Sequence, residues 1–104
     1  MKILVFNCGS SSLNYKVYEA CSQDMMVVMS GKAHRVGVTG SESAYIEHHS
    51  GSSYQKDIQP IPNHPQAARL VLDALREQGL EIDIIGHRFV HGGSYFQEST
   101  WLIP

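Results

Sequence analysis

The stretch Asn7-Cys8-Gly9-Ser10-Ser11-Ser12 decides how this chain can fold, because it separates two segments with different hydropathy patterns. The preceding run, residues 3–6, is continuously apolar, which is typical of a strand buried on both faces. The following run, residues 13–20, alternates, so that its odd-numbered residues from Leu13 to Val17 share one face. We therefore expect a tight turn at the carboxyl end of a central strand. Its backbone N–H groups and hydroxyls would suit a phosphate.

Outward from this turn, the sequence predicts a mixed sheet. Short turns between strands make neighbouring strands antiparallel pairs. The predicted strands are residues 1–6, 13–20, 25–33, a hairpin of 44–49 and 53–58 about Ser50-Gly51, and 82–90, with a loop at 34–43. We expect residues 94–103 to form a loop that leads into another short element.

One helix is predicted between the hairpin and the last strand. Asn63 is a good N-cap, Pro65 falls in the first turn, Gln66 lies three residues after the cap, and Gly79 is a typical C-terminal stop. The apolar stripe comprises Ala67, Leu70, Val71, Ala74 and Leu75, and the solvated face comprises Arg69, Asp73, Arg76 and Glu77. A strand reached from such a helix is expected to run parallel to the first strand. The pattern as a whole indicates an α/β fold, the N-terminal half of a ribonuclease-H-like domain, with residues 1–104 forming one unit.

The composition of the chain limits the classes of protein to which it can belong. The chain has 104 residues, 42% hydrophobic and 17% charged, with a formal net charge of -2, so we expect no nucleic-acid partner and no anionic membrane surface. No apolar run approaches the ~20 residues of a membrane span, and the N-terminus does not resemble a signal peptide. Cys8 and Cys21 lack metal-ligand spacing, which favours free thiols and a cytoplasmic location. We interpret Cys8 as a small residue beside the turn rather than a nucleophile.

A second glycine turn is expected at residues 87–93, at the same edge of the sheet as the first. Arg88 interrupts an apolar strand there, and two interpretations stay open: an anion clamp opposite the Gly/Ser turn, or a structural ion pair with Asp83 or Glu98. The histidines are mostly expected to be structural, and for His87 and His91 a second interpretation, as acid/base groups or ligands, stays open. The interpretations are hydrogen-bonded strand-end residues for His87 and His91, a solvated pair for His48 and His49, a loop residue for His34 and a helix-start residue for His64.

Three segments together resemble the acetate kinase family, which includes acetate, propionate and butyrate kinases. They are N-C-G-S-S-S-L-N-Y-K from Asn7, the N-H pair at residue 63, and G-H-R-F-V-H-G-G from Gly86. The family patterns are N-A-G-S-S-S-x-K and, approximately, G-H-R-V-V-H-G-G, and their order and spacing match over the whole chain. The resemblance implies the duplicated core shared by actin and sugar kinases. It also implies transfer of the γ-phosphoryl of ATP to acetate or a similar carboxylate, with Mg²⁺.

By matched position, the resemblance assigns roles to individual residues. Asn7 corresponds to the Mg²⁺ and phosphate residue, Ser10 and Ser12 to phosphate-loop hydroxyls, Arg88 to the partner of the substrate carboxylate, Val90 to a wall of its apolar pocket, and Asn14 to an ATP-phosphate position. At position 14 the family has lysine, so a positive charge is missing, and we expect this to weaken ATP binding unless Lys16 on the same strand face replaces it. These are binding roles, and we expect no catalytic residue within these 104 residues.

Family members are several times longer than this chain. We therefore expect the chain to be the N-terminal piece of such an enzyme, catalytically incompetent alone. The alternative is a non-catalytic interaction module that dimerises or pairs with a missing C-terminal half through an apolar face. A homodimer is the expected assembly.

Overall fold

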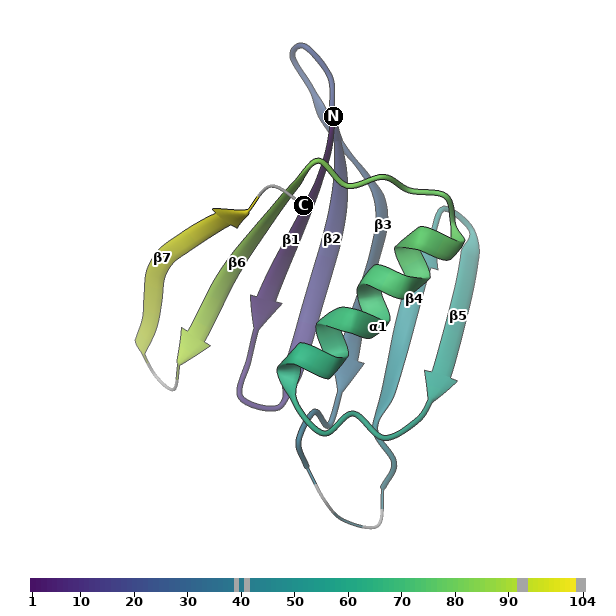
Figure 1. Ribbon diagram of the computed structural model, residues 1–104, viewed down its shortest axis with the longest axis vertical. Helices are drawn as coiled ribbons and strands as arrows, with labels where there is room; N and C mark the ends of the chain where they lie inside the picture. Colours follow the sequence, from purple (N-terminus) through teal and green to yellow (C-terminus); the bar gives the residue numbers. More distant parts are fainter. Residues whose placement is uncertain (39, 41, 92–93, 103–104) are drawn as a thin grey trace.

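In the computed structural model, the central strand β1 (Lys2–Cys8) lies between an antiparallel neighbour, β2 (Ser12–Ala20), and a parallel neighbour, β6 (Ile84–His91). The remaining strands are β3 (Met25–His34), β4 (Tyr45–Ser50), β5 (Ser53–Ile58) and β7 (Ser94–Leu102). The order in the sheet is β5-β4-β3-β2-β1-β6-β7 (Figure 1). The structure describes the backbone of residues 1–38, 40, 42–91 and 94–102, and side chains only as far as residue 87.

The predicted strands are confirmed in place and direction, and their boundaries need four corrections. β1 extends through Asn7 and Cys8, so the turn is shorter than residues 7–12. The β4–β5 turn is Gly51-Ser52, one residue later than predicted, because Gly51 takes the left-handed conformation, with φ 60°. β6 runs on to His91, one residue beyond the predicted strand 82–90, so residues 87–91 are not part of the predicted glycine turn at 87–93. Residues 94–102 form an edge strand antiparallel to β6 rather than a loop.

The helix α1 (His64–Glu77) begins and ends where the sequence predicts. The side chain of Asn63 caps it by accepting a hydrogen bond of 2.9 Å from the backbone N–H of Gln66. Gly79, with φ 73°, follows the C-cap. Ala67, Val71 and Leu75 are buried against the sheet. Among the described residues, no helix has both the length and the apolar character needed to span a membrane.

The two faces of the sheet differ because α1 lies across only one of them, in front of β3 and β4 in the view of Figure 1. On this covered face, Leu4 and Phe6 of β1 are buried, as are the predicted odd-numbered residues of β2: Leu13, Tyr15 and Val17. On the opposite face, which we call the open face, Ile3 and Val5 of β1 are only half-buried. The expectation that this strand is buried on both faces is therefore wrong for the described residues.

A buried polar pair crosses the covered face. The hydroxyl of Tyr15 on β2 and Nδ1 of His48 on β4 lie 2.5 Å apart, and His48 is only 5% exposed. Between them, β3 has Gly31, whose missing side chain leaves room for the Tyr15 ring. His48 is therefore not solvated as predicted, whereas His49, on the opposite face, is exposed. His34 is also not a loop residue: it ends β3 and its Nε2 lies 2.5 Å from Oε2 of Glu47.

Candidate functional site

The Gly/Ser turn connects β1 to β2 at the carboxyl end of β1, the end at which open α/β sheets bind ligands. The N–H of Gly9 donates to the carbonyl of Ser12 over 2.9 Å, which closes the turn. The carbonyl of Ser11 accepts from the N–H of Val36 at 2.9 Å. In the part of the chain that the structure describes, no side-chain or backbone partner is found for the hydroxyls of Ser10 and Ser12. The turn therefore keeps hydroxyl donors available for a ligand.

His64 ties the start of α1 to this turn. Its Nε2 lies 2.8 Å from the carbonyl oxygen of Gly9 and 3.1 Å from that of Ser12. Both partners are acceptors, so Nε2 carries the hydrogen and donates to them. The sequence identified His64 as a helix-start residue and as part of the N-H pair in the family resemblance, but a contact over 55 positions leaves no local signal. With the bond from Val36, three carbonyls of the turn are satisfied by protein donors.

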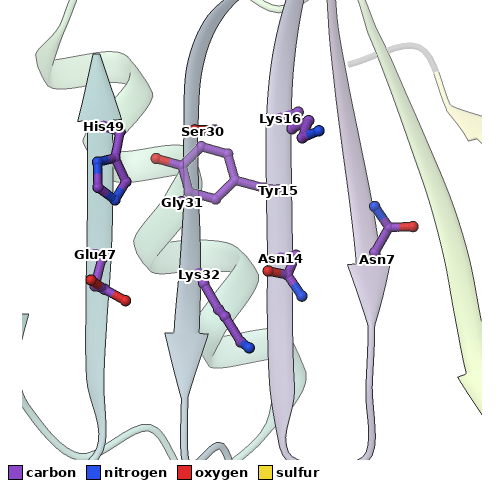
Figure 2. Close-up of a pocket in the computed structure, with 9 residues that line it drawn as sticks. All are labelled: Asn7, Asn14, Tyr15, Lys16, Ser30, Gly31, Lys32, Glu47 and His49. Atoms are coloured by element: carbon purple, nitrogen blue, oxygen red, sulfur yellow. The ribbon is translucent and has the colours of Figure 1, made fainter. Parts of the chain in front are cut away.

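A row of polar side chains crosses the open face next to the turn. Asn7 on β1 is the register partner of Asn14 on β2, and Asn14 is the register partner of Lys32 on β3. Lys16 and Ser30 form the neighbouring pair, one row further from the turn. Figure 2 shows these side chains around one depression, with a volume of about 240 Å³. Its lining is Asn7, Asn14, Tyr15, Lys16, Ser30, Gly31, Lys32, Glu47 and His49.

Positive charge dominates this depression. Glu47 is the carboxylate in its lining, and it already accepts hydrogen bonds from Tyr54 at 2.9 Å and from His34. These two hydrogen bonds hold the pKa of the Glu47 carboxyl below its usual value, and the bond from Tyr54 has the larger effect. Within the described residues, neither Lys16 nor Lys32 is within 4.0 Å of a carboxylate oxygen. Two lysines with uncompensated charge beside amide groups can bind an anion.

The predicted carboxylate-binding residues lie on β6. In the parallel register, Arg88 occupies the position beside Asn7, so the backbone places the two candidate residues on adjacent strands. Val90 follows two residues later on the same strand. The side chains of both, and that of Glu98, lie outside the described residues, as does the backbone of residues 92–93. Asp83, the other partner considered for Arg88, accepts a hydrogen bond of 2.8 Å from the backbone N–H of Lys2.

Cys8 does not belong to the site. It is 8% exposed on the covered face, and burial raises the pKa of its thiol, which disfavours the thiolate that a nucleophile needs. The interpretation as a small structural residue is supported, although Cys8 is the last residue of β1 rather than part of the turn.

A magnesium ion would find few ligands in the described residues. No group of three His, Cys, Asp or Glu side chains able to hold a metal is present among them. Asn7 offers a single neutral oxygen. Mg²⁺ often takes most of its ligands from phosphates and water, so Asn7 is suitable as one ligand of a phosphate-bound ion but not as a metal site by itself.

Comparison with known proteins agrees with this geometry. The model of the acetokinase family matches residues 2–104. The acetate kinase of Thermoanaerobacterium thermosaccharolyticum is 43% identical over 107 residues, which cover 96% of this chain and 26% of that protein. The chain thus spans about a quarter of the length of such curated relatives.

Solved structures of acetate and propionate kinases are also similar to this chain. The crystal structure of acetate kinase from Entamoeba histolytica has a TM-score of 0.67 at 47% identity, covering 92% of this chain and 22% of that chain. A propionate kinase from Francisella tularensis has a TM-score of 0.71 at 26% identity, covering 91% of this chain and 24% of that chain. Together with the strand order, these similarities confirm the predicted N-terminal half of a ribonuclease-H-like fold.

Proposed function

Because the chain belongs to the acetokinase family, we propose that it forms the N-terminal, phosphate-binding part of a carboxylate kinase. The enzyme would transfer the γ-phosphoryl group of ATP to acetate or a similar short carboxylate. A carboxylate oxygen forms a bond to the γ-phosphorus while the bond to the bridging oxygen breaks, giving acyl phosphate and ADP. The observation that carries the proposal is the meeting of the Gly/Ser turn, Asn7 and the Arg88 position at the carboxyl ends of β1 and β6.

Ser10, Ser12 and Asn14 are assigned to the phosphates of the nucleotide. Phosphoryl transfer depends mainly on positioning and on stabilising negative charge, so neutral donors and nearby cations are the groups required. The carbonyls of Gly9, Ser11 and Ser12 would repel an anion, but all three already accept hydrogen bonds from protein N–H groups. The groups of the turn that remain available to a phosphate are therefore hydrogen-bond donors.

Arg88 is assigned to the carboxylate of the acceptor, and Val90 to the apolar wall against its alkyl group. This assignment rests on sequence position and strand register. An arginine can hold a carboxylate by two parallel hydrogen bonds, which fixes the direction of the attacking oxygen. With the phosphates at the adjacent strand, acceptor and donor would meet above the ends of β1 and β6.

Asn7 is assigned as one oxygen ligand of Mg²⁺ that is bound to the phosphates. The ion would neutralise part of the phosphate charge during transfer. The side-chain amide of Asn7 lies beside that of Asn14 in the register, so both can approach the same phosphate.

Since the chain spans about a quarter of its relatives, the 104 residues are proposed to supply part of the active site and to lack turnover alone. The test is a chimera in which they replace the matching N-terminal quarter of the Thermoanaerobacterium enzyme. Acyl phosphate made from ATP and acetate is trapped with hydroxylamine. We expect the chimera to form product and the isolated chain to form none. A folded chimera without activity, or an isolated chain as fast as the chimera, would contradict the proposal.

The second candidate is a non-catalytic module that dimerises. A groove of about 340 Å³ between α1 and the start of β6 favours it, because its lining includes Leu72, Leu80 and Ile85. Exposed apolar surface of this kind favours association. Sedimentation velocity separates the two: a concentration-dependent dimer of the chain supports the module, and a monodisperse monomer counts against it.

A further inference from the structure

The sequence alone assigns no binding role to Lys32 on β3, but the structure places this residue beside the candidate site. It is the cross-strand partner of Asn14, and position 14 is where the acetate kinase family pattern N-A-G-S-S-S-x-K has lysine. Directly paired residues on adjacent antiparallel strands have their Cβ atoms about 5 Å apart, which is less than the length of a lysine side chain. A charge on β3 can therefore reach the place that a lysine on β2 would serve. Lys16, by contrast, pairs with Ser30, one row further from the turn.

Glu47 is the competing partner for Lys32, because the two residues are also paired across β3 and β4. Its carboxylate oxygens are already engaged, one with the hydroxyl of Tyr54 at 2.9 Å and the other with Nε2 of His34. Figure 2 shows the side chain of Lys32 extending away from Glu47, toward β2 and the end of the sheet at which β1 ends. Lys32 is half-buried, so its charge is less screened than that of the exposed Lys16.

We propose that Lys32 is a phosphate-binding residue, which supplies from β3 the positive charge that Asn14 lacks on β2, with Lys16 as the secondary cation. The proposal deepens the proposed function, on which it rests. The ligand is a phosphate group, carried by ATP, pyrophosphate or inorganic phosphate. The ammonium group binds the phosphate as a point charge, while Asn14 and the turn hydroxyls supply directed hydrogen bonds.

The experiment measures the affinity of the purified chain for inorganic phosphate, pyrophosphate and ATP by calorimetry, for the wild type and two matched variants. Lys32→Met removes the proposed ligand. Lys56→Met removes a lysine from the same face of β5, where its Nζ lies 4.3 Å from the centre of the Tyr45 ring. We expect Lys32→Met to weaken binding of the tightest probe about tenfold and Lys56→Met to change it less than about twofold. Circular dichroism checks that each variant is folded.

A double variant separates charge from structure. Asn14→Lys in the Lys32→Met background returns the charge to β2, and we expect it to recover most of the lost affinity. The same substitution in the wild type should gain much less, because one lysine already serves the position. Equal binding by the wild type and folded Lys32→Met would overturn the role of Lys32 alone. Failure of every probe to bind the wild type would contradict the proposed function itself. The ratio of the three affinities identifies which molecule carries the phosphate.

Discussion

The hydroxyl of Tyr15 on β2 and Nδ1 of His48 on β4 lie 2.5 Å apart and are joined across β3 at Gly31, where that strand has no side chain. The pair is buried on the face covered by α1. It links three strands that all contribute to the candidate site: Asn14 is next to Tyr15, Lys32 is next to Gly31, and Glu47 is next to His48.

Gly31→Ala should therefore destabilise the fold. A Cβ at this position would overlap the Tyr15 ring and the backbone carbonyl of Glu47, and a carbonyl in a sheet cannot move aside as a side-chain tip can. We expect a loss of about 2 kcal/mol or more in the free energy of unfolding, measured with urea. Ser30→Ala, on the adjacent residue of the open face, is the control and should change stability by less than about 0.5 kcal/mol. Equal losses of stability in Gly31→Ala and Ser30→Ala would show that the Tyr15 ring does not need the space left by Gly31.

His48 should make stability depend on pH. Burial lowers its pKa, so the folded state keeps His48 neutral where the unfolded chain, with a histidine pKa of about 6.5, binds a proton. The unfolded state then holds more protons, and stability falls as the pH drops below about 6.5, by at most about 1.4 kcal/mol per pH unit from this group. Urea unfolding at pH 7.5, 6.5 and 5.5 measures the effect.

His48→Gln should flatten this pH dependence even though it lowers stability at pH 7.5. His49→Gln is the matched control on the exposed neighbour and should keep most of the wild-type slope between pH 6.5 and 5.5, because it leaves the burial of His48, the largest cause of its lowered pKa, in place. A His48→Gln slope equal to that of the wild type would assign the pH dependence to other groups.

His64→Leu should disturb the Gly/Ser turn. It removes the donor to the carbonyls of Gly9 and Ser12 and leaves both without that partner, so we expect a loss of about 1–2 kcal/mol in stability and weaker binding of pyrophosphate. Asn63→Ala, which removes the N-cap of the same helix, should lose about 1 kcal/mol with phosphate affinity unchanged. Parallel losses of affinity in both variants would mean that His64 acts only through the stability of α1.

Arg88→Leu in the chimeric enzyme should raise the KM for acetate at least about tenfold, because the variant lacks the proposed partner of the carboxylate, and should change the KM for ATP little. Arg69→Leu, on the exposed face of α1, is the control. If Arg88→Leu raised both KM values equally, the assignment of Arg88 to the acceptor would be wrong.

The elements that the sequence predicts well depend on local interactions. Asn63, Pro65 and Gly79 mark the helix through contacts within one turn, and the alternation from Leu13 to Val17 fixes which side of β2 is buried. The order of β1, β2, β3 and β6 follows from short turns and one crossover helix. The motifs around Asn7 and Arg88 identified the family.

The features that the sequence misses depend on contacts between distant strands. His48 and His49 look alike in the sequence, and only the pairing of β4 with β3 buries one and exposes the other. Lys32 lies 18 positions from Asn14, so its proximity follows from the β2–β3 register, whereas Lys16 could be considered because it is on the same strand. Likewise, residues 94–102 show no clear alternation of apolar and polar residues, so the sequence does not predict that they pair with β6.

Every assignment above requires that the carboxyl end of β1 in this chain binds a phosphate group. The most direct measurement is a titration of the ¹⁵N-labelled chain with pyrophosphate, followed by the NMR shifts of the backbone amides. We expect saturable shifts that are largest for Gly9, Ser10, Ser11, Ser12 and Asn14, extend to Lys32, and are lost in the Ser10→Ala, Ser12→Ala double variant. Shifts that do not saturate, or that centre on another surface such as the groove between α1 and β6, would contradict it.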